Sequence, residues 1–588
     1  MKFSKTAFFI SAALLVFVGS IFYPRWEKSS TEAQISWDAS GYYWYLPSIF
    51  IYHDLKGQHF KDDILSRYHP TPDHDFQQGF IEPGSGHYVM KYTIGTAIME
   101  APFFFVADAL ATPLGYRADG FSRPYQFMIY FGGICFALLG LWYLRKLLLL
   151  YYDDKIVAVV LLLLVFGTNY LNYCGVDVGM THNWLFTLYV FILLNTHFYY
   201  QHKKLKYALR LGALIGMTAL IRPPEIIAVL IPLLWGMENL KPSTLKRQGS
   251  FLWQQRKHFL FAGIAAIAIL SIQFIYWKYA TGQWFVYSYQ DQGFSWLHPH
   301  SRVYAFSYQS GWLTYTPLMI IVLLGIFPFF RSGRNKLAII VMIVLNYYLV
   351  SAWNIYDYGG FGGRAMVQSY PVLIFLLAAL IKYLSAHKWL FRAALPFLLL
   401  ATYFNLWWTY QAHGGTLIGG IPTSGRYYWR TILRYNGDPG IQLLRDNKDY
   451  YTGAMLNTTV LYQKQFTDNA DSFRLTGTHK ISPEIIIPKP RQSVDRIRAY
   501  ADVRIGDKEW NVWNMTQFII RFKKSGQVVK TNMVRLQRIL NDHEKKKVEL
   551  DAVLPGPDDY DTIVIFFKNF NDHICTISNL KVIGFNDR

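Results

Sequence analysis

Charged residues and cysteines are scarce in this chain. Only 16% of its 588 residues are charged, whereas 52% are hydrophobic and 18% are aromatic. This composition excludes a single ordinary soluble domain. Cys135, Cys174 and Cys575 lie far apart in the sequence, so they show neither a disulfide framework nor a zinc-binding spacing. Repeats of solenoid length and low-complexity segments are missing as well.

Long apolar runs fill the first 410 residues. Many of them approach about 20 residues, the length that crosses a bilayer. Lysine and arginine occur there in short clusters between the runs, as in membrane proteins whose cytoplasmic loops are positively charged. Because no basic face or nucleic-acid motif accompanies the net charge of +20, nucleic acid is not expected as a partner. We therefore predict a polytopic α-helical membrane protein, with membrane lipids among its partners.

Eleven of the apolar runs are predicted to be transmembrane helices. A further run, 93–115, contains two acidic residues and is assigned to an interfacial helix. With that assignment the basic clusters fall in cytoplasmic loops, the N-terminus is cytoplasmic and residues 25–124 form a large first outer loop. The first run is longer than a signal-peptide core and has no clear Ala-x-Ala site, so we expect it to remain as an anchor. The predicted spans are 6–23, 125–144, 156–171, 184–200, 207–221, 226–240, 259–279, 315–330, 337–352, 367–383 and 390–408.

The character of the sequence changes near residue 410. Apolar residues occupy every second position from Ile497 to Ile505, which is typical of a half-buried strand. Several more short alternating segments follow, separated by turn residues. We therefore predict a connector over 411–468 and an extracytoplasmic β-sandwich of jelly-roll-like type over 469–588. This tail is expected either to bind sugar or to serve as a stabilising lid or a surface for a partner.

Asp38 lies in the stretch ISWDASGYYWYL, just after the first predicted span. An acid at that position is either a solvated boundary charge or a functional group. The aromatic residues around it offer flat surfaces on which sugar rings stack, although aromatics also collect at membrane interfaces for physical reasons. These candidate stacking residues are Trp37, Tyr42, Tyr43, Trp44 and Tyr45.

Three cations, Lys91, Arg222 and Arg364, are predicted to lie on the outer side, against the positive-inside tendency. A cation kept there needs a partner or an anionic ligand. The glycine-rich GGFGG segment before Arg364 lets the backbone approach such a ligand closely. We interpret the three as a phosphate-binding set. The alternatives are that Lys91 only reaches toward the membrane surface and that Arg222 only pairs with Glu225.

Weaker candidates complete the predicted site. Asp177, His182 and Glu82 are expected to face the same outer cavity. A divalent metal is the one cofactor considered, since carboxylates and imidazoles are its usual ligands. The alternative is that these loop residues are merely polar. The candidate metal ligands are Asp73, Asp75, His298 and His300.

Taken together, these motifs resemble the GT-C class of membrane glycosyltransferases. The resemblance covers about residues 1–410. Within the class, the chain is similar to the protein-mannosyltransferase and aminoarabinose-transferase relatives. It is carried by Asp38 after the first span, by KYTIGTAIMEAPFF, by FGTNYLNY with MTHNW, and by LIRPPE. The tail looks like the carbohydrate-binding sandwiches appended to some GT-C arabinosyltransferases.

The resemblance implies an enzyme. Its donor would be a polyprenyl-phosphate-linked sugar and its acceptor a hydroxyl of a lipid, glycan or protein. Asp38 would be the general base of an inverting displacement, and Lys91, Arg222 and Arg364 would bind the donor phosphate. The expected location is a bacterial plasma (inner) membrane, with the active face and the tail toward the periplasm, in the cell envelope.

Two other functions stay open at this level. An oligosaccharide ligase or polymerase would take a whole glycan from a lipid pyrophosphate and would favour the metal site. A lipid or glycan transporter would place charges within its spans and show an internal hydropathy repeat. The predicted spans are nearly free of such charges, so the transporter is the weakest of the three.

Overall fold

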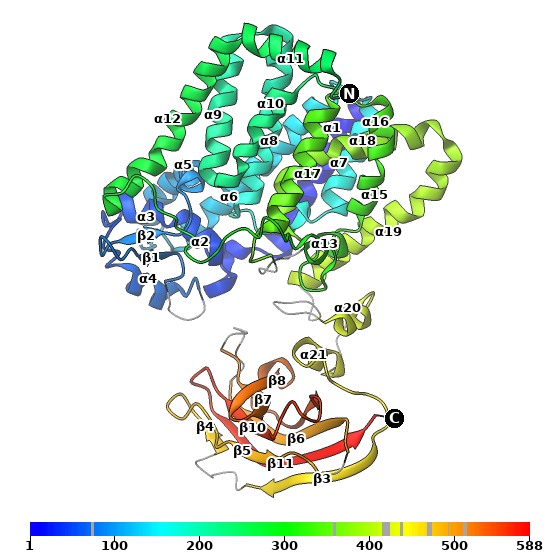
Figure 1. Cartoon of the computed structure of the whole chain (residues 1–588). Helices are drawn as coiled ribbons and strands as arrows, with labels where there is room; N and C mark the ends of the chain where they lie inside the picture. The colour runs from blue at the N-terminus through cyan, green and yellow to red at the C-terminus, as the bar shows by residue number, and fades with distance from the viewer. Residues whose placement is uncertain are drawn as a thin grey trace. The chain divides into compact units, whose positions relative to one another are not determined.

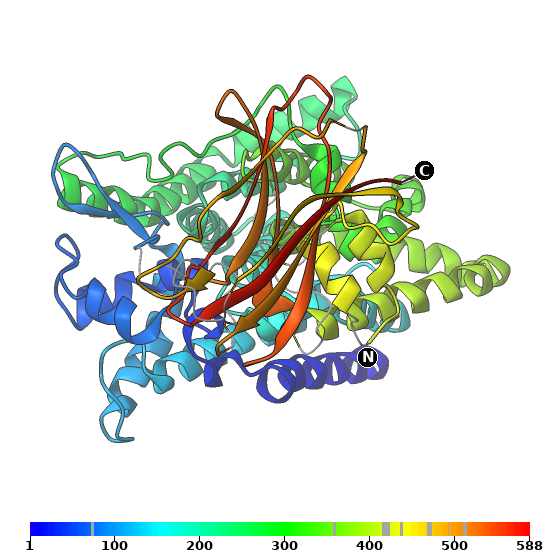
Figure 2. The ribbon, with the colours of Figure 1, turned by 90° about the horizontal axis from the view of Figure 1, so that it is seen from below.

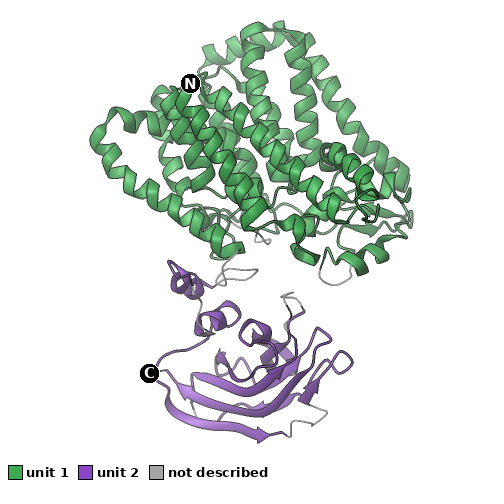
Figure 3. Cartoon of the chain, turned by 180° about the vertical axis from the view of Figure 1, so that it is seen from behind, with its two compact units in different colours: residues 1–414 green, residues 415–588 purple. Residues whose placement is uncertain are grey.

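The computed structural model describes residues 1–71, 76–356, 360, 362–413, 424–435, 439–466, 473–491, 493–507, 509 and 514–587. The chain forms two compact units, Met1–Gly414 and Gly415–Arg588 (Figure 3). The described residues of unit 1 form helices and a small β-hairpin, and those of unit 2 form mainly β-strands.

Unit 1 contains five described segments that are long and apolar enough to cross a membrane. The remaining predicted spans also coincide with helices, which are shorter, interrupted or less apolar, so the count of eleven crossings stays a prediction. The five segments are Lys2–Glu27, Arg123–Leu148, Arg256–Thr281, Arg364–Ala386 and Lys388–His413. The other helices in predicted spans are α7 (Asp154–Gly167), α8 (Thr181–His202), α9 (Leu205–Ile221), α10 (Leu230–Leu234), α15 (Leu318–Leu324), α16 (Ile326–Ser332) and α17 (Lys336–Ala352).

Helix burial separates an inner helix from two outer ones. Within the segment that ends in α18 (Tyr370–Ala386), 94% of the apolar window is buried, against 11% in α12 (Arg256–Thr281) and 17% in α19 (Lys388–His413). Figure 1 shows α12 and α19 on the two flanks of the helical unit. An apolar helix exposed in this way has a face suited to lipid.

Small residues let helices of unit 1 approach closely. A Cβ on Gly212 of α9 would lie 2.0 Å from the carbonyl oxygen of Ala262 in α12. A Cβ on Gly325, between α15 and α16, would lie 2.2 Å from the carbonyl oxygen of Leu376 in α18. Such contacts are typical of packing between membrane helices, where small residues allow the backbones to meet.

The first outer loop folds into a small subdomain. It contains α2 (Trp37–Tyr43), α3 (Tyr45–Phe50), α4 (Lys61–Tyr68), the hairpin of β1 (Gly79–Ile81) and β2 (Tyr88–Met90), and α5 (Gly95–Ala111). These elements share an aromatic core that extends to α6 (Arg123–Leu148) and α12. The run 93–115 is therefore helical over most of its length, and its interfacial position remains a prediction.

In the described part of unit 2, two antiparallel sheets share a large apolar core. The strand orders are β5-β10-β7-β8 and β3-β11-β6-β9, with β4 paired to β11. β11, red in Figures 1 and 2, pairs with β3 and β6 along its length. The strands are β3 (Leu456–Gln465), β4 (Arg474–Leu475), β5 (Ile485–Pro488), β6 (Arg496–Ile505), β7 (Gln517–Lys524), β8 (Gln527–Arg535), β9 (Lys545–Val553), β10 (Thr562–Lys568) and β11 (Cys575–Asn586).

The structure corrects the start of the β-rich region. β3 lies inside the stretch 411–468 that the sequence predicts as a connector, yet it pairs with β11. The sequence gives no sign of this strand, because most of its residues are exposed and it lacks the alternation of a half-buried strand. Two short helices, α20 (Gly425–Thr431) and α21 (Pro439–Asp446), also fall in that stretch.

A buried ion pair joins two neighbouring strands of unit 2. Arg498 of β6 lies opposite Asp551 of β9 and donates two hydrogen bonds to its carboxylate, at 2.6 and 2.7 Å. The Asp551 carboxylate also accepts from the backbone N–H of Tyr451 at 2.7 Å and its side chain is 0% exposed. Because both ions are fully hydrogen-bonded, their burial is tolerated.

Candidate active site

The short helix α2 places Asp38 in its first turn. Trp37, at the start of the helix, adopts a left-handed conformation with φ of 50°. Its backbone is fixed at both ends, since its N–H donates to Pro70 O at 2.9 Å and its carbonyl accepts from Gln78 Nε2 at 3.1 Å. These contacts fix the direction in which Asp38 leaves the helix.

Asp38 lies between a guanidinium and a phenol. Arg364 Nη2 donates to one carboxylate oxygen at 2.5 Å, and Tyr92 Oη donates to the other at 2.7 Å. Burial alone would raise the pKa of Asp38, but Arg364, Tyr92 and the ammonium of Lys91 together hold the pKa below its ordinary value. With this lowered pKa, the Asp38 carboxylate is ionised at neutral pH. Its side chain is 28% exposed and therefore accessible.

The hairpin β1–β2 delivers Lys91 and Tyr92 to this carboxylate. The backbone N–H of Lys91 donates to Gln78 O at 2.8 Å, and its carbonyl accepts from Ser288 Oγ at 2.8 Å. The Lys91 ammonium lies 5.7 Å from the ring centre of Tyr92 and 6.0 Å from that of Tyr289. The cation therefore rests on aromatic faces beside Asp38.

A close backbone contact brings Arg222 to the same place. The Thr93 hydroxyl donates to Ile221 O at 3.0 Å, and a Cβ on Gly95 would lie 2.5 Å from the backbone nitrogen of Ile221. Arg222 is the next residue, and its charge acts on the phenols of Tyr42 and Tyr289. Those phenols are also within electrostatic reach of Asp38, so Arg222 belongs to the same cluster.

A glycine turn positions Arg364. Gly362 and Gly363 both have left-handed backbones, with φ of 62° and 60°, and a Cβ on Gly363 would lie 2.6 Å from Trp312 Cβ. Only glycine takes that conformation in that space without strain. Asn169 Nδ2 donates to Gly362 O at 2.6 Å, which anchors the turn. Arg364 then begins a 3₁₀ helix, Arg364–Ser369.

His182 is buried and belongs to a chain of hydrogen bonds with Gln368 and Glu225. Tyr189 Oη and Gln368 Nε2 donate to the two carboxylate oxygens of Glu225, at 2.6 and 2.7 Å. Because the Gln368 amide nitrogen is thus a donor, its oxygen accepts from His182 Nδ1 at 2.7 Å. Both Arg222 and Arg364 act electrostatically on His182. Glu225 is therefore engaged by Tyr189 and Gln368, rather than serving Arg222 alone.

The prediction of sugar stacking is wrong for three of the five aromatic residues. Tyr43, Trp44 and Tyr45 are 0% exposed and belong to the aromatic core of the outer-loop subdomain. Their polar atoms bond inside it, with Gly120 O at 2.6 Å, Gln58 Oε1 at 2.8 Å and Tyr92 O at 2.7 Å respectively. Trp37 is 37% exposed, and Tyr42 packs on Tyr92 with ring centres 4.4 Å apart. Of the five predicted stacking residues, Trp37 and Tyr42, the latter only 7% exposed, stay predictions.

Asp177 has a structural role rather than a place in the cation cluster. It forms an ion pair with Arg25, which also donates to Ala33 O at 2.9 Å and to Ser36 Oγ at 2.8 Å. Ser36 precedes α2, so this pair fastens the segment that carries Asp38. Sequence reasoning missed Arg25, although it is another cation on the predicted outer side.

Glu82 is also separate from the cluster. Its carboxylate accepts the backbone N–H groups of Gly84 and Ser85, at 3.0 and 2.7 Å, in the turn of the β1–β2 hairpin. It therefore stabilises a turn, as carboxylates commonly do beside glycine-rich loops.

The predicted metal site finds no support in the part of the chain that the structure describes. There, no group of three or more His, Cys, Asp or Glu side chains lies close enough to hold an ion. His300 stacks on Tyr356 with ring centres 4.1 Å apart. Asp73 and Asp75 fall outside the described residues, so their pairing with His298 and His300 stays a prediction.

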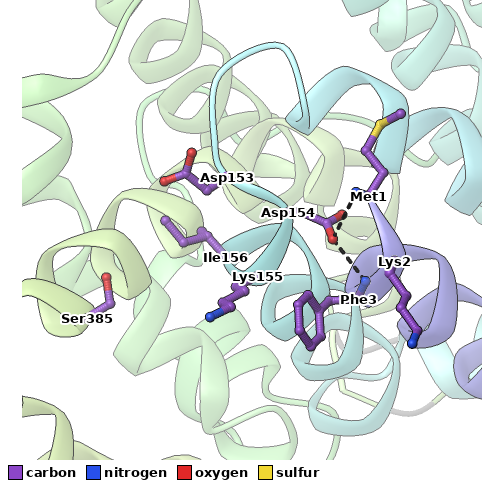
Figure 4. A pocket seen from close by; sticks show the side chains of 8 residues that line it. All are labelled: Met1, Lys2, Phe3, Asp153, Asp154, Lys155, Ile156 and Ser385. Carbon is purple, nitrogen blue, oxygen red and sulfur yellow. Dashed lines mark hydrogen bonds and ion pairs between the residues drawn. The ribbon is translucent and has the colours of Figure 1, made fainter.

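A surface hollow near the first residues of the chain lies apart from the predicted site. It is lined by Met1 to Phe3, Asp153 to Ile156 and Ser385 (Figure 4). Asp154 accepts the backbone N–H of Phe3 at 2.9 Å and lies 3.5 Å from the terminal amine. No predicted site residue lines this hollow, and its carboxylate serves to fasten α1 (Lys2–Phe17) to α7.

The described structure is that of a helical protein with several membrane-length apolar helices and a C-terminal β-sheet region. No protein-family model and no curated protein matches the chain. Among solved structures, it is similar to the arabinosyltransferase EmbB from Mycobacterium smegmatis, with 12% identity and a TM-score of 0.33. The match covers 99% of this chain and 64% of that chain. Similarity at that level assigns no activity, so the function is argued from the geometry of the site.

Proposed function

We propose that this protein is a membrane glycosyltransferase of the GT-C class that transfers a sugar from a polyprenyl-phosphate donor to an acceptor hydroxyl on the outer face of the membrane. The observation that carries the proposal is the cluster at Asp38. It combines an ionised, accessible carboxylate with the cations of Lys91, Arg222 and Arg364. A proton acceptor beside an anion-binding group is what transfer from a phosphate-linked sugar requires.

Asp38 acts as the general base. Its carboxylate takes the proton of the acceptor hydroxyl as the hydroxyl oxygen attacks the anomeric carbon of the sugar. The bond from that carbon to the phosphate oxygen breaks, and the electron pair leaves with the lipid phosphate. Attack opposite to the leaving group inverts the anomeric carbon.

The cations stabilise the leaving phosphate, whose charge grows as the bond breaks. The Lys91 ammonium lies against the rings of Tyr92 and Tyr289, close enough to Asp38 to act on its carboxylate. Before transfer, Arg364 contacts Asp38. In this proposal it also contacts the donor phosphate, so the base and the phosphate share this cation. A fork of parallel N–H groups suits this role, since guanidinium binds carboxylate and phosphate alike.

Trp37 and Tyr42 are the aromatic residues that supply sugar contacts in this proposal. Trp37 is exposed at the start of α2, beside Asp38, and Tyr42 lies within electrostatic reach of Asp38, Arg222 and Arg364. The acceptor is a lipid, a glycan or a protein of the cell envelope. Unit 2 is the region proposed to contact glycan.

The test is to measure turnover of purified wild-type protein and of Asp38→Asn with a panel of polyprenyl-phosphate sugars as donors. Loss of a positioned base costs about 10²–10⁴-fold in rate, so the variant is expected to lose that much turnover while binding the donor normally. The matched control is Asp62→Asn, an exposed acid of the same outer loop, which should leave turnover unchanged. Equal turnover in Asp38→Asn would remove Asp38 from the mechanism.

The same panel separates the alternatives. A ligase or polymerase would use only pyrophosphate-linked glycans and would respond to a chelator. A transporter would move the lipid without forming a new glycosidic bond. Transfer from a monophosphate donor, unaffected by chelator, favours the proposed function over both.

A further inference from the structure

Two neighbouring surface hollows lie where three segments that are predicted to be cytoplasmic meet. The first, described above, has a volume of about 580 Å³ and contains the starts of α1 and α7 (Figure 4). The second, of about 420 Å³, is lined by Ser385 at the end of α18 and by Lys388, Phe391 and Arg392 at the start of α19; we call it the α19 hollow. Because Ser385 lines both, the two hollows adjoin.

The α19 hollow is positively charged. Lys388 and Arg392 are four residues apart in the helix, so they lie on one face of it together with Phe391. Among the described residues, no acidic side chain lines this hollow. The adjoining hollow contains two acids, but one of them, Asp154, accepts the backbone N–H of Phe3 at 2.9 Å. Basic side chains therefore outnumber acidic ones over the two hollows; the basic ones are Lys2, Lys155, Lys388 and Arg392, and the acidic ones are Asp153 and Asp154.

Beside the α19 hollow, the first half of α19 exposes apolar side chains. Trp389 and Phe397 are 81% and 66% exposed, whereas Trp407 and Trp408 in the second half are 2% and 1% exposed. Pro396 lies between the two halves, and proline is a common cause of a helix kink. Figure 1 shows α19 on the flank of the helical unit. A cationic hollow next to an exposed apolar surface suits a ligand that has an anionic head and an apolar tail.

We propose that the α19 hollow binds the head group of an anionic phospholipid of the cytoplasmic leaflet, with the phosphate on Lys388 and Arg392 and the acyl chains along the first half of α19. Guanidinium and ammonium groups are usual phosphate ligands, and basic pockets between membrane helices bind anionic head groups. A free phosphate ion would leave the apolar surface unused, and a head group without net charge would not offset the excess of basic side chains. A bound lipid is expected to steady the start of α19, because the apolar side chains there are largely exposed. The site is independent of Asp38, which belongs to the first outer loop.

Hydrogen–deuterium exchange of the full chain in lipid nanodiscs tests this site. The discs consist of phosphatidylcholine alone, or of phosphatidylcholine with either phosphatidylglycerol or phosphatidylethanolamine added. Slower exchange at the start of α19 with phosphatidylglycerol, but not with phosphatidylethanolamine, supports the site. Inorganic phosphate added to phosphatidylcholine discs, compared with chloride at equal ionic strength, should have no effect. The proposal is overturned by the absence of a response to phosphatidylglycerol, and equally by the same response to phosphatidylethanolamine or to inorganic phosphate.

Lys388→Gln combined with Arg392→Gln removes both charges at exposed positions, so the fold should be unchanged. Binding, measured from the mole fraction of phosphatidylglycerol that gives half the exchange response, should weaken about tenfold or more. The matched control, Lys204→Gln combined with Lys206→Gln, removes two exposed charges that line neither hollow and should respond as wild type does. An unchanged response in the Lys388 and Arg392 variant overturns the site, as does an equal loss in the control, which would indicate only general attraction to an anionic membrane. Because the readout is exchange in α19, failure here leaves the transferase proposal unaffected.

Discussion

Replacing Arg364 by glutamine tests how the protein keeps Asp38 ready to accept a proton. In wild type the guanidinium contacts Asp38 at 2.5 Å, and the two side chains are only 19% and 28% exposed. The pair is therefore shielded from solvent more than an ordinary surface ion pair, whose contribution is close to zero. Glutamine keeps a hydrogen-bond donor of similar size but removes the charge.

The sign of the effect follows from the contacts. Arg364 favours the ionised form of Asp38, so its loss raises the pKa of that carboxyl toward its ordinary value or above it, because burial remains. A hydrogen bond to a charged group contributes about 1.5–3 kcal/mol, and one pH unit corresponds to about 1.36 kcal/mol. The acid limb of the activity profile should therefore move to higher pH by about one to two pH units. Tyr92 and Lys91 limit the change, since both stay beside the carboxylate.

The assay is kcat/KM for the active donor as a function of pH, because this profile reports groups of the free enzyme. Arg364→Lys should give an intermediate profile, since it keeps the charge without the fork. Arg302→Gln, an exposed arginine of α13 (Ser301–Phe306), is the control of equal charge change and should superimpose on wild type. An acid limb in Arg364→Gln that coincides with wild type, or moves to lower pH, would refute this account of Asp38.

Other predictions test the packing around Asp38, the stability of unit 2 and the orientation in the membrane. Gly41→Ala would place its Cβ 2.6 Å from the ring of Tyr92, so we expect a loss of activity of about 100-fold, whereas Gly263→Ala in α12, which meets nothing, should be harmless. Asp177→Asn should loosen the segment before α2, seen as faster proteolysis of the first outer loop. Asp551→Ala leaves a buried guanidinium without its carboxylate, so pulse proteolysis of the full chain should show unit 2 destabilised by about 3–5 kcal/mol. A tag at the C-terminus should be accessible to a protease in spheroplasts whose inner membrane is intact, and a cytoplasmic tag would contradict the predicted orientation.

Sequence patterns predicted the helices better than their packing. The predicted spans 125–144 and 259–279 lie inside α6 and α12 and end within four residues of their limits, because a bilayer-length apolar run has few alternatives to a helix. They did not predict that the helix in 226–240 ends at Leu234, or that 315–330 is interrupted at Gly325. Those breaks depend on neighbouring helices, such as the approach of Gly325 to α18, which no local pattern contains.

For the candidate site, too, the sequence suggested some residues, whereas their contacts depend on the tertiary structure. The sequence suggested Lys91, Arg222 and Arg364 because a cation on the predicted outer side needs an anionic partner or ligand, but the position of Arg222 depends on the contact of Gly95 with Ile221. Tyr92 was missed, although it adjoins Lys91, because a tyrosine in a tyrosine-rich loop carries no signal of its own. The same abundance misled the prediction for Trp44 and its neighbours. Composition identifies aromatics suited to stacking, and only tertiary structure distinguishes a surface from a core.

The charge of the proposed site explains why one arginine contacts the base. Before transfer, Asp38 carries one negative charge and a phosphodiester donor carries another. After transfer, Asp38 holds the acceptor proton, and the lipid phosphate, now a monoester, carries both charges. The total is unchanged, so the cations of Lys91, Arg222 and Arg364 can face the same net charge throughout while that charge moves from carboxylate to phosphate. The guanidinium of Arg364 can bind a carboxylate or a phosphate. This explains why it contacts Asp38 before transfer, when the negative charge is still on the carboxylate.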